Sequence, residues 1–149
     1  MSPQPDDPGA TRASALAREL RILIGQLKRR LREEAQAGDL TLSQISVLGR
    51  LEREGAATVT ALAKAEGMRP QSMGATVAVL EAAGLVQGTP DPSDRRQTIL
   101  SLTAACRDMI EAGRAARQDW LFRTIRSKLS AAEQEELATG IALLKRLVD

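Results

Sequence analysis

Hydrophobic residues recur at helical spacing along most of the chain. Leucines between residues 16 and 31 lie three or four positions apart, which places them on one face of a helix predicted from about Thr11 to Gln36. A helix this long in a small chain cannot bury its whole stripe within its own fold, so we expect part of it to pack against a second subunit. The stripe residues assigned to this dimer interface are Leu16, Leu20, Leu23 and Leu27.

Three shorter helices are predicted next, over residues 41–54, 58–67 and 70–84. The first opens with Thr41 and Gln44 at the spacing of a capping box, and glycines close all three. The third begins with a proline, a residue suited to the first position of a helix. The last two helices, joined by a short turn that contains glycine, are typical of a helix-turn-helix.

A β-hairpin is predicted after these helices. Leu85–Thr89 and Gln97–Leu102 have the composition of short strands, and the segment PDPSDRR between them is rich in turn-forming residues. A hairpin at this place, directly after a helix-turn-helix, is a wing.

Two amphipathic helices complete the pattern. Thr103 starts a long helix that continues to about Lys128, and Ser130 with Glu133 forms a second capping box at the start of the last helix. The apolar stripe of the last helix is assigned to the same dimer interface as the leucines of the first helix. Its residues are Leu137, Ile141, Leu144 and Val148.

The order of these elements predicts a mainly α fold with a small β-hairpin, in which a winged helix-turn-helix core is flanked by N- and C-terminal dimerisation helices. The predicted parts are a disordered tail over residues 1–11, a dimerisation helix over 12–38, the winged helix-turn-helix over 39–103 and dimerisation helices over 104–149.

Composition narrows the possible functions. The chain lacks histidine and tyrosine and has a single cysteine, so the usual general base, the usual zinc ligands and an internal disulfide are missing. We therefore expect no enzyme, no metal and no cofactor. The proline-rich start has no apolar core, and no apolar run approaches 18 residues, which favours a cytoplasmic protein without a membrane partner.

From about Leu40 to Thr103 the sequence resembles the MarR family of transcriptional regulators. The matching segments are LTLSQISVLGRL, TVTALAKAEGM, RPQSMGATVAVLEAAGLV and DPSDRRQTILSLT. The resemblance implies a homodimer that binds double-stranded DNA at a pseudo-palindromic operator. It also implies a repressor that a small molecule, often aromatic or phenolic, releases from DNA.

The helix that begins at Pro70 is the candidate recognition helix. Its polar residues Gln71, Ser72 and Thr76 are suited to base edges in the major groove, and Arg69 lies at its start. Cations on the two preceding helices are candidates for contacts with phosphate groups. These are Arg50, Arg53 and Lys64.

The turn of the wing carries Arg95 and Arg96, whose guanidinium groups suit a narrow minor groove. Asp94 is adjacent, and we expect it to orient the wing by fixing one arginine while the other enters the groove. The family resemblance assigns Arg96 to the groove.

Three alternatives stay open. Many family members carry Arg at the position of Ala75 and an Asp-Arg pair at those of Ala78 and Val79, so the alternative to a DNA-binding regulator is a winged-helix module that has lost sequence-specific DNA binding and binds a protein partner. Salt dependence separates the two functions, because only DNA binding releases many counterions.

Cys106 is expected to be a buried apolar residue rather than an oxidant sensor. Trp120 belongs either to a core or interface or to the wall of a ligand cavity.

Overall fold

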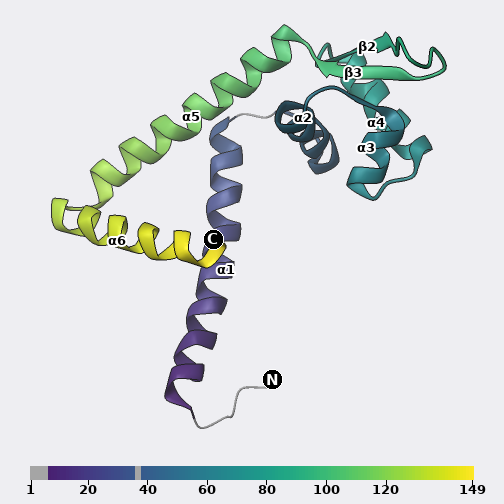
Figure 1. The fold of residues 1–149 in the computed structure, drawn as a ribbon. Coiled ribbons are helices and arrows are strands. Elements are labelled where there is room, and N and C mark those ends of the chain that lie inside the picture. Colours follow the sequence, from purple (N-terminus) through teal and green to yellow (C-terminus); the bar gives the residue numbers. More distant parts are fainter. Residues whose placement is uncertain (1–6, 36–37) are drawn as a thin grey trace. The chain divides into compact units, whose positions relative to one another are not determined.

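The computed structural model describes residues 7–35 and 38–149, which form helices and a small sheet (Figure 1). The elements are α1 (Pro8–Ala35), α2 (Leu42–Glu54), β1 (Ala57–Thr58), α3 (Val59–Glu66), α4 (Pro70–Ala82), β2 (Val86–Pro90), β3 (Thr98–Leu102), α5 (Ala104–Lys128) and α6 (Ala131–Val148). The predicted fold class, mainly helical with a hairpin after the third short helix, is confirmed.

The chain divides into two units. The winged unit contains residues 38–114, and therefore α2, α3, α4, the sheet and the first part of α5. The arm unit contains α1, the rest of α5 and α6.

The winged unit has one hydrophobic core to which every one of its elements except β1 contributes a fully buried side chain. Because apolar residues on α2, α3 and α4 repeat at helical spacing, each helix turns one face to this core. The core residues are Val47, Leu48, Leu51, Leu62, Ala63, Met73, Val77, Leu80, Val86, Leu100, Leu102 and Cys106.

Local sequence signals fix the ends of the helices. The Thr41 hydroxyl accepts a hydrogen bond from the Gln44 amide at 3.2 Å, and the Gln44 side chain accepts one from the Thr41 amide at 2.9 Å, which confirms the predicted capping box. Ser130 and Glu133 form the second capping box in the same way. Gly67 ends α3 in the left-handed conformation, with φ of 65°.

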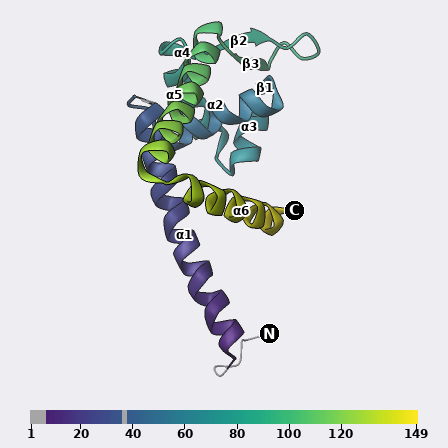
Figure 2. The same ribbon diagram turned by 90° about the vertical axis from the view of Figure 1, so that its left-hand side faces the viewer.

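The sheet has the strand order β1-β3-β2, with both pairs antiparallel. β2 and β3 are the predicted hairpin, and in both ribbon views the loop between them extends away from the helices of the winged unit (Figures 1 and 2). The sequence did not predict β1. Its two residues, Ala57 and Thr58, pair with Leu100 and Ile99, and a strand this short has no periodicity of its own.

The first helix begins at Pro8, three residues before the predicted start. Asp7 explains the difference, because its Oδ1 accepts a hydrogen bond from the Gly9 amide at 3.0 Å and Pro8 occupies the first helical position. The disordered tail predicted for residues 1–11 is therefore helical from residue 8, whereas residues 1–6 lie outside the described residues.

The arm unit lacks a core of its own within the described residues. Neither α1 nor α6 has a buried side chain. Leu23 on α1 is 56% exposed, and the other predicted interface residues are exposed or only partly buried. Within this unit the Arg30 guanidinium lies 5.2 Å from the centre of the partly buried Trp120 ring, a cation–π contact between α1 and α5.

No helix in the described parts of the chain combines the length and the apolar character needed to cross a membrane.

Candidate nucleic-acid interface

The helix α4 is held by its buried face. Met73, Val77 and Leu80 are buried in the core, which fixes the rotation of the helix about its axis. Gln71 and Ser72, in its first turn, are exposed as a consequence, and Thr76 is partly exposed. The fold therefore leaves the N-terminal turn of α4 open to a partner along the polar side that the sequence predicts.

One of the three polar side chains is already engaged inside the helix. The Thr76 hydroxyl donates a hydrogen bond to the Ser72 carbonyl at 3.1 Å. This bond uses the only proton of the hydroxyl, so Thr76 can still accept a hydrogen bond but has no donor to offer. Gln71, whose amide both donates and accepts, remains the best-equipped residue for a base edge.

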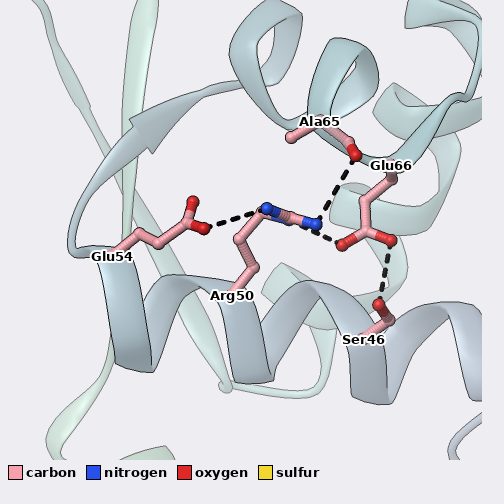
Figure 3. Close-up of polar contacts among 5 residues, drawn as sticks. All are labelled: Ser46, Arg50, Glu54, Ala65 and Glu66. Carbon is pink, nitrogen blue, oxygen red and sulfur yellow. Dashed lines mark hydrogen bonds and ion pairs between the residues drawn. The ribbon is translucent and has the colours of Figure 1, made fainter. Parts of the chain in front are cut away.

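Arg50 lies in a polar cluster between α2 and α3 (Figure 3). Its Nε donates to Glu66 Oε1 at 2.8 Å, its Nη1 donates to Glu54 Oε1 at 3.0 Å, and its Nη2 reaches the Ala65 carbonyl at 3.5 Å. Ser46 donates a further hydrogen bond to Glu66 at 2.9 Å. These bonds hold the guanidinium predicted to contact phosphate between two helices, so Arg50 is not among the proposed DNA contacts.

The cluster is electrostatically complementary. The hydrogen bond from Arg50, opposed in part by burial, lowers the pKa of Glu66 below the ordinary value for glutamate. The same hydrogen bond raises the pKa of Arg50 above its ordinary value. The sequence did not point to Ser46 or Glu66, because their hydrogen bonds join two different helices and no fixed sequence spacing predicts such a contact.

The other predicted phosphate contacts are exposed. Arg53 on α2, Lys64 on α3 and Arg69 at the N-cap of α4 all face solvent. Arg53 lies back along its helix, since a side chain added at Gly49 would meet its Nη1 at 3.0 Å. Among the residues that the structure describes, none of these three cations takes part in an ion pair within 4.0 Å, so each charge is available to an anionic partner.

The turn of the wing is organised by Asp94. Its Oδ1 accepts hydrogen bonds from the backbone amide and from Nε of Arg96, both at 3.1 Å. Asp94 therefore fixes Arg96, whereas the sequence analysis expected it to fix one arginine and leave Arg96 for the groove. Only Nε is used, and the side chain of Arg96 is 92% exposed, so its two terminal nitrogens still point to solvent.

The wing is joined to the helices through Thr103. Its hydroxyl donates to the Gly84 carbonyl at 2.6 Å, and the same oxygen accepts a hydrogen bond from the Cys106 amide at 3.1 Å. Thr103 thereby caps α5 and ties it to the turn between α4 and β2. The sequence predicted a helix that starts at Thr103, but neither the cap nor the contact with Gly84, which lies 19 residues away.

Cys106 is fully buried in the core of the winged unit. Burial, together with the charge of Glu52, raises the pKa of its thiol above the ordinary value, against a smaller opposite effect of Arg107. A thiol with a raised pKa is a poor nucleophile at neutral pH. The prediction of a buried apolar cysteine is confirmed.

Comparison with known proteins identifies this arrangement. The MarR family model matches residues 38–97, which covers the helix-turn-helix and most of the wing. A helix-turn-helix-type transcriptional regulator of Mycobacterium tuberculosis is 37% identical over 134 residues, or 90% of this chain and 93% of the relative. The chain belongs to the MarR family. This MarR-family chain is therefore a transcriptional regulator with a winged-helix fold.

Solved structures agree with this assignment. A Pseudomonas aeruginosa protein assigned as a transcriptional regulator is 38% identical, with a TM-score of 0.78 over 93% of this chain and 96% of the other. The transcriptional regulator Tm0710 of Thermotoga maritima is 25% identical, with a TM-score of 0.77 over 90% and 94%. A Staphylococcus aureus MepR mutant bound to an oligodeoxyribonucleotide shares the fold at 21% identity, with a TM-score of 0.70 over 89% and 97%.

Proposed function

We propose that this MarR-family regulator is a homodimeric repressor that binds a pseudo-palindromic DNA operator. One α4 of each subunit would lie in one of two successive major grooves, about 34 Å apart. The observation that carries the proposal is the exposed polar first turn of α4, held in a winged helix-turn-helix with free cations beside it. The MepR complex with an oligodeoxyribonucleotide supports it, because that protein has the same fold.

Each proposed contact has a separate role. Gln71 and Ser72, with Thr76 as an acceptor, would meet base edges, while Arg53, Lys64 and Arg69 would contact phosphate groups. Arg95 and Arg96 would reach the minor groove beside the recognition helix, with Asp94 holding Arg96 by its Nε. The contacts that fix position are thus distinct from those that can distinguish bases.

The dimer would form through the arm unit. Apolar stripes on α1 and α6 that remain exposed in a single chain represent a large hydrophobic surface, and burial against a second copy would stabilise it by about 25 cal/mol for each square ångström covered. Two recognition helices at a fixed spacing then match the twofold symmetry of an operator.

Ligand response is the regulatory part of the proposal. The winged unit contains a pocket of about 350 Å³ between α2 and α5, within the range of small-molecule sites. It is lined by Leu51, Glu52, Gly55, Leu102, Arg107, Ile110, Glu111 and Arg114. Leu51, Leu102 and Ile110 supply apolar wall, whereas Arg114 is paired with Glu52. This mixed lining suits a small molecule with an aromatic ring and a polar group, which would release the operator by favouring another spacing of the recognition helices. A panel of aromatic acids and phenols should therefore weaken operator binding, and a panel without effect would contradict ligand control.

The experiment that tests DNA binding is selection of bound duplexes from a random pool, followed by affinity measurement at 50 and 200 mM salt. We expect two half-sites about one helical turn apart. The affinity should fall by about a thousandfold or more between the two salt concentrations, because several phosphate groups are neutralised. Failure to select any duplex, or an affinity that salt leaves unchanged, would favour the alternative of a protein-interaction module.

A further inference from the structure

The exposed side of α4 is almost entirely apolar after its first turn. Met73, Val77 and Leu80 occupy the buried side, so the residues about half a turn away face outward. The exposed residues on the outward side are Gln71, Ser72, Ala75, Ala78, Val79 and Ala82.

This surface has few hydrogen-bonding groups beyond Gln71 and Ser72. The helix contains one charged residue, Glu81, and no basic residue. The proton of the Thr76 hydroxyl is used within the helix. Val79, by contrast, is 52% exposed, although burying an apolar side chain of this kind away from water is favourable. The middle of α4 is therefore equipped for van der Waals contact rather than for hydrogen bonding.

The winged unit that carries this apolar strip also exposes cations. Arg69 lies at the start of α4, Lys64 lies on α3, and the wing carries Arg95 and Arg96. A strip of methyl groups on a unit that exposes these charges suits the major groove, in which the base edges lie between two rows of phosphate groups. The single apolar group that bases present there is the C5-methyl group of thymine.

We propose that Ala75 and Val79 read thymine methyl groups, and that each half-site of the operator carries thymine at the contacted positions. Ala75 lies one turn after Gln71 and Val79 one turn after Ala75, so the three side chains follow one another along the groove. Gln71 would read the adjacent base by hydrogen bonds, and the two apolar residues would read the next ones by contact. The inference rests on the proposed function, because it assigns bases to the same helix.

Uracil in place of thymine tests the contact directly, since the two bases differ only by the methyl group. Each thymine of a duplex selected from the random pool is replaced by uracil in turn, and the dissociation constant is measured for each duplex. We expect an increase of about fourfold at one or two positions of each half-site, the effect of about one buried methyl group. Other positions should show a ratio near one.

Variants assign the effect to residues. Val79→Ala removes the two terminal methyl groups of Val79, and it should bring the uracil-to-thymine ratio at its position close to one. Ala75→Gly removes the methyl group of Ala75 and should do the same at the neighbouring position. Ala105→Gly is the matched control, because Ala105 is exposed on the first turn of α5 outside the helix-turn-helix, and its ratios should equal those of the unchanged protein.

The outcomes separate this inference from the proposed function. Salt-dependent binding with ratios near one at every thymine, or a selected site without thymine in its half-sites, would overturn methyl reading and leave DNA binding in place. Ratios that stay at fourfold in both variants would also overturn the assignment to Ala75 and Val79. If no duplex binds at all, the proposed function fails, and methyl reading fails with it.

Discussion

At the scale of single residues, Arg50 and Glu66 set the relation between α2 and α3. Two carboxylates hold the guanidinium at 2.8 and 3.0 Å, and Ser46 fixes the second oxygen of Glu66. The side chain of Glu66 is only 15% exposed, so its hydrogen bonds are shielded from water. The position of α3, and of the turn that leads into α4, depends on this contact.

We expect Glu66→Gln to lower the free energy of unfolding by about 1 to 3 kcal/mol, because it removes the charge from hydrogen bonds in a partly buried place. Denaturant unfolding at pH 7 measures the change. Glu54→Gln is the matched control: it removes the other partner of Arg50, but Glu54 is 59% exposed, and the loss should stay within about 1 kcal/mol. Equal losses in the two variants would contradict the special role of Glu66.

The same pair predicts a dependence on pH. The pKa of Glu66 is lower in the folded chain than in the unfolded chain, so its carboxylate stabilises the fold fully above the unfolded value of about 4.3. This contribution is lost as the pH falls below that value and through the lower folded pKa. The stability difference between Glu66→Gln and the unchanged protein should therefore be constant above about pH 5 and shrink in acid.

At the scale of elements, the sequence predicted what local signals determine. The two capping boxes, Pro70 at the start of α4 and Gly67 at the end of α3 all act within a few residues, and each predicted end lies at or next to the observed one. β1 could not be predicted, because its two residues are strand only through pairing with β3, about 40 residues later. The contact between Arg50 and Glu66 could not be predicted either, because it also joins residues of two different elements.

The wing is the element in which the observed contacts differ from the predicted roles of the arginines. Since Asp94 holds Arg96 by Nε alone, Arg96 can enter a minor groove in a fixed orientation while Arg95 stays unrestrained. We expect Arg96→Ala to weaken binding to a selected operator with A/T-rich flanks by about 1 to 3 kcal/mol, with the dimer intact. Gel-shift titrations of Arg96→Ala and Arg95→Ala measure this effect, and a larger loss in Arg95→Ala would move the groove contact to that residue.

At the scale of the whole molecule, the two units differ in what they bury. The winged unit has a continuous core, whereas α1 and α6 have no buried residue. The leucine and isoleucine stripes were visible in the sequence as a helical period, but a period does not show which surface will cover them. A stripe that a single chain leaves open is the physical reason to expect a second copy.

Leu23→Asp should convert the proposed dimer into monomers, because it would place a charge in the apolar contact proposed between subunits. Light scattering at several protein concentrations measures the molar mass. Val79→Asp is a control of similar exposure, 52% against 56%, and it lies in the winged unit. It should remain dimeric while losing operator binding, and monomers from Val79→Asp or dimers from Leu23→Asp would each contradict the assignment of the arms.

Because Cys106 is buried, its reactivity reports on the opening of the winged unit. The sequence contains one sulfhydryl group, and it is inaccessible while the winged unit is closed. An alkylating reagent can react with the Cys106 thiol only during a transient opening of the winged unit, so the labelling rate measures how often that unit opens. The arms carry no sulfhydryl and are not labelled, so stabilisation of the winged unit by the proposed operator would be measured as a slower reaction of Cys106.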